Sequence, residues 1–127
     1  MKRSMLFRLA LVGVTFFALQ RVNAASAVAW DGGSNVITSA GQFTERLAKY
    51  DALSTGRKKF GANVRVIAST GRSGYGAIAV AARANGHGQI IGIALGRGSQ
   101  SEADRLAMGQ CLKAGGVWPE VRWRIKG

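Results

Sequence analysis

Two nine-residue stretches of this chain are nearly the same, and this similarity constrains the fold more than any other feature. Residues 45–53 read ERLAKYDAL, and residues 104–112, at an offset of 59, read DRLAMGQCL. Four positions are identical, and both stretches begin with a carboxylate. Leucine and alanine recur in each at the spacing of an amphipathic helix. A helix that occurs twice predicts two structural units of the same kind.

The first unit reads as strand, strand, helix, strand. Alternating small and β-branched residues at 25–30 and 34–41 predict two strands joined by a tight DGG turn. The helix that follows has an apolar stripe at steps of four, three and three, which is expected to face the core: Phe43, Leu47, Tyr50 and Leu53. Gly56 is the expected helix stop, and residues 63–69 predict the third strand.

The second unit repeats this order. Residues 77–84 and 89–96 predict two strands joined by an Asn-Gly turn. Ser99 is the expected cap of the next helix, and Glu102 is placed to bond back to the backbone amide of Ser99. The final strand alternates strictly, with Val121, Trp123 and Ile125 expected on its inner face.

We therefore expect an α+β fold of two tandem ββαβ repeats, with antiparallel sheets and one helix per repeat. The repeats are assigned to residues 25–69 and 77–127, joined by a glycine-rich linker at 70–76, within one domain at 25–127. Matching segments lie at offsets that range from 50 to 59. Two such units would either join edge to edge into one six-stranded sheet or pack around a shared core. The alternative is that two helices rich in arginine, leucine and alanine look alike by chance.

The segment 1–24 has the organisation of a secretory signal helix. Three cations precede an apolar run at 9–19, and Val22 and Ala24 are the small residues that a signal peptidase accepts before its cut. We expect cleavage after Ala24, export to the periplasm or beyond, and no transmembrane anchoring afterwards. The alternative is an uncleaved anchor.

The balance of charge is strongly basic. The chain has 18 basic and six acidic residues, a net charge of +12. Removal of the segment 1–24 takes four basic residues and no acidic one, which leaves 14 against six, a net charge of +8. Such a charge favours anionic partners: an acidic protein, an anionic envelope surface or, less strongly, nucleic acid. Cys111 is the single cysteine, so it is expected either as a small buried residue or in an intermolecular disulfide.

The second unit resembles a family of small exported bacterial domains of unknown function. The resemblance lies in YGAIAV at 75–80, in GIALGRGSQSEADRLAMGQC at 92–111 and in VRWRI at 121–125. It implies export and a small αβ domain, and it implies no catalytic residues. Members of that family often have further cysteines after the helix and the last strand. This chain has none there, so their disulfide is not transferred.

The sequence offers few residues for catalysis. His87, the single histidine, lies at an expected hairpin tip, where no second group would orient it as a base. One cysteine and one histidine cannot complete a structural zinc site, and the acids read as turn, cap or helix-surface residues. We therefore expect no enzymatic activity, no metal and no cofactor. The alternative is a small envelope hydrolase.

A glycine-rich segment before the second helix is a candidate anion site. Arg97, Gly98 and Ser99 combine a guanidinium with free backbone amides at a helix N-terminus. The alternative is a plain turn from strand to helix.

The basic strands are the main functional prediction. Arg122, Arg124 and Lys126 are expected on one face of the last strand, with Arg65 at the equivalent place in the first unit. A basic cluster is expected on the loop before the strand of Arg65: Arg57, Lys58 and Lys59. The predicted function is a non-enzymatic interaction module, an inhibitor or immunity-type protein among the options. Nucleic-acid binding is the third alternative, disfavoured because no exposed aromatic residue is expected.

Overall fold

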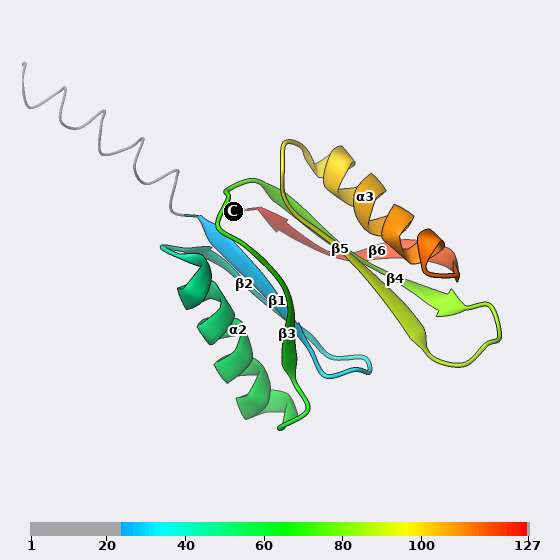
Figure 1. The fold of residues 1–127 in the computed structure, drawn as a ribbon, viewed down its shortest axis with the longest axis horizontal. Coiled ribbons are helices and arrows are strands. Elements are labelled where there is room, and N and C mark those ends of the chain that lie inside the picture. Colours follow the sequence, from blue (N-terminus) through cyan, green and yellow to red (C-terminus); the bar gives the residue numbers. More distant parts are fainter. Residues whose placement is uncertain (1–23, 127) are drawn as a thin grey trace, which may run out of the picture.

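The computed structural model describes residues 24–126, so the predicted signal helix lies outside the described residues. The elements follow the chain in this order: β1 (Ala25–Trp30), β2 (Val36–Gln42), α2 (Glu45–Phe60), β3 (Arg65–Thr70), β4 (Tyr75–Arg83), β5 (Gln89–Arg97), α3 (Gln100–Lys113) and β6 (Gly116–Lys126) (Figure 1). Neither helix of this part of the chain is long and apolar enough to cross a membrane.

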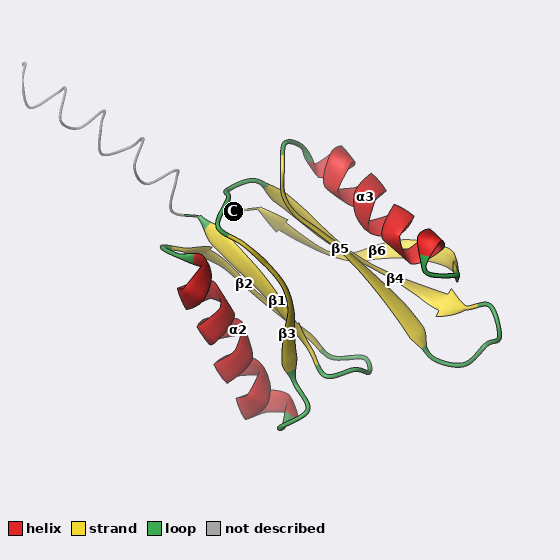
Figure 2. Ribbon diagram, viewed as in Figure 1, coloured by secondary structure: helices red, strands yellow, loops and turns green. Residues whose placement is uncertain are grey.

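The strands form two antiparallel sheets of three strands. Their orders are β2-β1-β3 and β5-β4-β6, so the first strand of each unit is central in its own sheet (Figure 2). Each unit therefore has the order strand, strand, helix, strand. The predicted α+β class and the ββαβ element order are confirmed.

The two units pack as four layers, helix, sheet, sheet, helix (Figure 1). One cluster of buried residues joins α2 to the first sheet, and a second joins α3 to the second sheet. A third cluster lies between the sheets and is centred on Val28, Ile78 and Ile125. Of the two arrangements expected from the sequence, the shared core is therefore the one observed. The apolar strand faces that the helices leave open cover each other.

Strand register shows how closely the two units correspond. Ala29 of β1 pairs with Val66 of β3, and Ala79 of β4 pairs with Val121 of β6. The central strands thus correspond at an offset of 50, from 29 to 79, and the last strands at an offset of 55, from 66 to 121. Both sheets have a bulge beside these pairs, after Val28 in one and after Ile78 in the other. The longer β4–β5 hairpin of the second unit accounts for the increase in offset.

The helices also correspond at an offset of 55, not at the 59 of the sequence match. Their caps are Thr44 and Ser99, and each accepts a bond from a backbone N–H three positions later, at 3.1 Å. Each helix places a small residue against its sheet at every fourth position: Ala48, Ala52 and Gly56 in α2, and Ala103, Ala107 and Cys111 in α3. The sequence match is therefore displaced by one helical turn.

The prediction of the buried face of α2 was wrong. Phe43 is 70% exposed, Leu47 44% and Tyr50 70%, and only Leu53 of the predicted stripe packs against the core. The reason is the close approach of the helix to its sheet. A Cβ at Gly56 would lie 2.7 Å from Cγ1 of Val64, a distance that leaves room for glycine alone.

The predicted end of α2 was also wrong. The helix passes through Gly56 and ends at Phe60, and its C-cap is Gly61, whose φ of 98° is in the region that favours glycine. The three cations expected on a loop form its last turn instead: Arg57, Lys58 and Lys59. Positive charge at that end is stabilised by the helix dipole.

Candidate functional site

The cations of β6 are exposed, as predicted, but the strict alternation is broken by the bulge. Val121 packs against the cluster under α3, whereas Trp123 packs between the sheets with Ile125. Arg124 lies on the α3 side, where it bonds to Asp104 of that helix. The prediction that Val121 and Trp123 share one face was therefore wrong.

Each of the three β6 cations has a partner within the chain. Arg122 Nε lies 3.2 Å from Oε1 of Glu120. Arg124 forms a bidentate pair with Asp104, with Nη2 at 2.8 Å and Nε at 3.2 Å. The hydrogen bond from Arg124 lowers the pKa of Asp104 and raises that of the guanidinium. Lys126 Nζ lies 5.8 Å from the centre of the Tyr75 ring. The two ion pairs, of Arg122 and Arg124, reduce the charge that β6 offers to a partner.

The other predicted cations do not join this row. β3, which carries Arg65, contacts β5, whereas β6 contacts β2 at the other side of the two sheets. Arg65 is therefore on the opposite side from Arg122 and Arg124. In the last turn of α2, Arg57 donates through Nε to the carbonyl of Val64 at 3.3 Å, and Lys58 and Lys59 are exposed.

The predicted anion site is filled by a carboxylate of the chain. Glu102 accepts from Arg97 Nη2 at 3.1 Å and from the backbone N–H of Gly98 at 3.2 Å, while its own N–H donates to Ser99 Oγ. The bond from Gly98, followed by that from Arg97, lowers the pKa of Glu102. The carboxylate of Glu102 thus accepts from the backbone N–H of Gly98. The expected capping box would have used the N–H of Ser99, one residue later.

The residues that the sequence offered for chemistry lie apart. His87 is exposed at the β4–β5 hairpin, where its backbone N–H donates to Oδ1 of Asn85 at 2.9 Å. Cys111 is buried under α3, and burial raises the pKa of its thiol. The expectation of a buried cysteine is confirmed. Within residues 24–126, no three side chains of His, Cys, Asp and Glu are grouped so that they could hold a metal.

The structure brings together a different set of residues along β3, β5 and α3. A cleft of about 380 Å³ opens between the two sheets on that side. Its walls are mostly apolar: Trp30, Ile67, Ala68, Ile91, Ile93 and Gln110. A second hollow, of about 410 Å³, continues along α3 past Leu106 and Gly109 and shares Gln110 with the first. We call these two adjoining hollows the basic groove, because of the residues at its rim.

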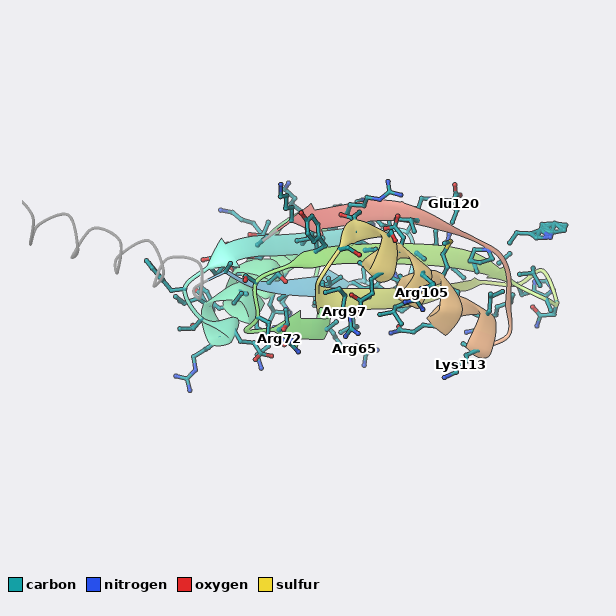
Figure 3. All side chains as sticks on the ribbon, turned by 90° about the horizontal axis from the view of Figure 1, so that it is seen from above. Arg65, Arg72, Arg97, Arg105, Lys113 and Glu120 are labelled. Atoms are coloured by element: carbon teal, nitrogen blue, oxygen red, sulfur yellow. The ribbon has the colours of Figure 1, made fainter. Side chains whose placement is uncertain are left out.

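Five cations line this side of the molecule. They come from the two strands, the loop after β3 and the helix: Arg65, Arg72, Arg97, Arg105 and Lys113. Figure 3 shows them along one long side of the molecule, with Glu120 on the other. Arg105 and Lys113 line the second hollow directly. Of the five, Arg97 alone forms an ion pair within residues 24–126. Two cations thus line the groove itself, Arg105 and Lys113, and three more lie on the same side of the molecule: Arg65, Arg72 and Arg97.

The side chain of Gln110 is built into the groove wall. Its Oε1 accepts from the backbone N–H of Ile93 at 2.8 Å, and its Nε2 donates to the carbonyl of the same residue at 2.7 Å. Ile93 lies in β5, an edge strand, so these bonds satisfy backbone groups that would otherwise be open to another strand. Gln110 thereby fixes α3 to the edge of β5.

A second feature that the sequence reasoning missed is Trp118. Its side chain is 83% exposed, and its φ of 52° is unusual for a residue other than glycine. It lines a hollow of about 230 Å³ at the start of β6 with Val80, Val117 and Arg122 among others. The expectation that no aromatic residue is exposed was therefore wrong, since Phe43 and Tyr50 are exposed as well.

Comparisons with protein-family models, curated proteins and solved structures found no match to this chain. The resemblance of the second unit to exported domains of unknown function therefore stays an expectation, and functional residues have to be argued from the geometry alone.

Proposed function

We propose that this chain is a non-enzymatic interaction module that binds an acidic protein through the basic groove. The observation that carries this proposal is the pairing state of the cations. Within residues 24–126, two of the three predicted cations of β6 form ion pairs, Arg122 and Arg124, and Lys126 lies near the ring of Tyr75. Of the five cations on the side of the groove, Arg97 alone forms an ion pair within those residues. Unpaired surface cations add to the positive field that draws an acidic partner to the surface, and they do not have to give up an internal ion pair in order to contact it.

The apolar floor favours a protein over nucleic acid as the occupant. Ile67, Ile91 and Ile93 offer aliphatic contact to side chains of an extended acidic segment. Single-stranded nucleic acid would need several aromatic platforms for successive bases, and Trp30, which is only partly exposed, is the one aromatic residue among those that line the two hollows. The most exposed aromatic residues lie elsewhere: Trp118, Phe43 and Tyr50. The hydrolase alternative has no comparable support, because His87 is exposed at a hairpin.

Two triple variants with equal charge test the groove against β6. One variant changes the groove, with Arg65→Ser, Arg105→Ser and Lys113→Ser. The other changes the last strand, with Arg122→Ser, Arg124→Ser and Lys126→Ser. Both variants lose three positive charges. A difference between them in the capture of envelope proteins therefore shows where the binding surface lies and does not reflect net charge. We expect the affinity of the groove variant for the acidic partner to fall by about tenfold or more, because a loss of about 1.4 kcal/mol of contact energy corresponds to tenfold. The β6 variant should keep the affinity of the parent.

The opposite result would move the binding surface to β6, where the sequence alone placed it. Equal loss in both variants would mean that net charge alone attracts the partner. Nuclease treatment separates the nucleic-acid alternative, because captured material of that kind would disappear with the nuclease. Far-ultraviolet circular dichroism and thermal unfolding of each variant check that the fold is kept, since Arg124→Ser removes the partner of Asp104.

Export also remains a proposal, and it depends on residues outside the described part of the chain. Mass spectrometry of the protein recovered from the cell envelope or the medium should find Ala25 as the first residue. An intact Met1 would point to the uncleaved anchor instead.

A further inference from the structure

The outward face of α2 carries a ridge of large apolar side chains. Leu47 and Tyr50 lie about 140–160° around the helix from Ala52, which is buried against the sheet. Phe43 stands directly before the cap of the helix, and it is as exposed as Tyr50, at 70%. In the four-layer arrangement α2 is an outer layer (Figure 1). Leu47 and Tyr50, on the side of α2 opposite Ala52, therefore face away from the first sheet. We call these three side chains the α2 ridge.

The second unit shows that the fold does not require this ridge. At the offset of 55 that relates the helices, α3 has Glu102 where α2 has Leu47, and Arg105 where α2 has Tyr50. The position of Phe43 corresponds to Gly98. Two helices with the same topology, the same cap chemistry and the same small-residue packing thus differ in their outer surface. The topology of the unit therefore does not by itself require apolar residues on the outer surface of its helix.

The ridge is flanked by positive charge. Helix α2 carries five cations against two acids, and all seven are exposed: Arg46, Lys49, Arg57, Lys58 and Lys59 against Glu45 and Asp51. Three of the cations form its last turn. On the outer side of the helix, three cations lie beside Leu47 and Tyr50: Arg46, Arg57 and Lys58. Aromatic and aliphatic side chains next to lysine and arginine are the residue types that contact the interface of an anionic bilayer.

We propose that the α2 ridge docks the protein on the surface of a lipid bilayer that contains anionic lipids. None of the three hollows described above is lined by a residue of α2. Separate protruding side chains insert between lipid headgroups without needing a complementary shape, whereas a protein partner needs one. A second copy is disfavoured, because its own α2 would bring five cations and two acids against the same surface.

Membrane docking goes beyond the proposed function and uses a different surface. The basic groove lies beside β3, β5 and α3, whereas the ridge lies on the outer side of α2. A protein held on a membrane through α2 would keep the groove free for its partner. Loss of vesicle binding and loss of partner capture should therefore follow from separate variants.

The test uses the protein as it is recovered from the envelope and measures sedimentation with two kinds of vesicle. One kind is pure phosphatidylcholine, and the other contains one third phosphatidylglycerol. We expect binding to the anionic vesicles and little to the neutral ones, with a decrease on adding salt. All variants keep the same N-terminus, so differences in vesicle binding among them reflect the substitutions in α2.

The decisive variant copies the outer surface of α3 onto α2, with Leu47→Glu and Tyr50→Arg. It leaves the net charge unchanged, and α3 shows that the fold accepts these residues at the equivalent positions. We expect its affinity for the anionic vesicles to fall by about tenfold or more, because the apolar contact is lost. Capture of the acidic partner should stay as in the parent. Leu112→Ser, at a side chain of α3 that is 57% exposed, is the control and should have no effect.

A second variant separates charge from apolar contact. Lys58→Gln with Lys59→Gln keeps the ridge but removes two cations, and it should weaken binding to the anionic vesicles by about tenfold while leaving neutral vesicles unaffected. Membrane docking is overturned if the parent does not bind anionic vesicles, or if Leu47→Glu with Tyr50→Arg binds them as well as the parent. It is also overturned if that variant instead loses an envelope protein, which would make the ridge a protein-docking surface.

Discussion

Two glycines of the second unit, Gly92 and Gly109, differ in the space that is open to an added methyl group. A Cβ on Gly92 of β5 would lie 2.1 Å from the carbonyl oxygen of Ala107 and 3.1 Å from Sγ of Cys111. A Cβ on Gly109 of α3 would have nothing within 4 Å. Gly92 is therefore the place where α3 comes closest to its sheet, and Gly109 is an ordinary helical glycine.

Gly92→Ala is expected to destabilise the protein by roughly 1–3 kcal/mol or more, because the helix backbone must move. Gly109→Ala is expected to stabilise it by about 0.5–1 kcal/mol, since alanine loses less backbone entropy in a helix. Urea unfolding of both variants measures the two effects. Equal effects of the two substitutions would show that α3 does not approach β5 as closely as described.

Asp104 should make stability depend on pH. The hydrogen bond from Arg124 lowers its pKa below the ordinary 3.8, so the folded state favours the charged form. The contribution is complete above the unfolded value and is lost as the pH falls through the lower folded value. The Tm of the parent should therefore exceed that of Asp104→Asn above about pH 5, and the difference should shrink toward about pH 2.

Asp51→Asn is the control for this measurement. Asp51 is exposed on α2 and forms no ion pair within residues 24–126, so its replacement should leave the difference from the parent small at every pH. A constant difference between the parent and Asp104→Asn down to about pH 2 would contradict the role of the Arg124 bond.

At the scale of the elements, the two helices show how far a sequence pattern reaches. The strand, strand, helix, strand order could be predicted, because turns, caps and alternation are local signals. The buried face of α2 could not. Phe43, Leu47 and Tyr50 have the spacing of a core-facing stripe, but the alanine and glycine positions match the short distance to the sheet. Which of the two candidate faces of α2 is buried depends on the distance between the helix and its sheet. A local sequence pattern does not encode that distance.

The edge of β5 yields a prediction at the same scale. Gln110→Ala removes both bonds to Ile93 and should cost about 1–2 kcal/mol, because two backbone groups lose their partners. It should also raise self-association at high protein concentration, since the strand edge becomes open. Urea unfolding and light scattering measure the two effects. Ser101→Ala, at an exposed position of the same helix, is the control. If Gln110→Ala were as stable as the parent, the two bonds from Gln110 to Ile93 would not hold α3 to the edge of β5.

At the scale of the whole molecule, the two units depend on each other. Val28 and Ile78 are both fully buried and meet in the cluster between the sheets. A single unit would expose that face to water. The two sheets are therefore expected to unfold together, in one cooperative transition.

Val28→Ala should test this dependence. Loss of two buried methyl groups is expected to cost about 1–3 kcal/mol, and the effect should reach the second unit. Native-state hydrogen exchange should show lower protection at amides of β4 as well as β1. The substitution Val117→Ala is the control, because Val117 is 37% exposed and lies away from the shared cluster. Unchanged protection in β4 would mean that the units fold independently.

The sequence alone determined the secondary-structure order, its repetition in two units and the strong positive charge, because each follows from local patterns or from composition. The exact correspondence of the helices, at an offset of 55, came from the structure. Only the tertiary structure decided that the sheets pack face to face. This packing puts Arg65 on the opposite side from Arg122 and brings five cations, spread along the chain from Arg65 to Lys113, to the side of the molecule that carries the basic groove. The same packing left the α2 ridge outside. The physical reason is that the side of the molecule on which a residue lies, and how deeply it is buried, depend on the packing of the layers. That packing joins residues far apart in the chain, which local sequence patterns do not encode.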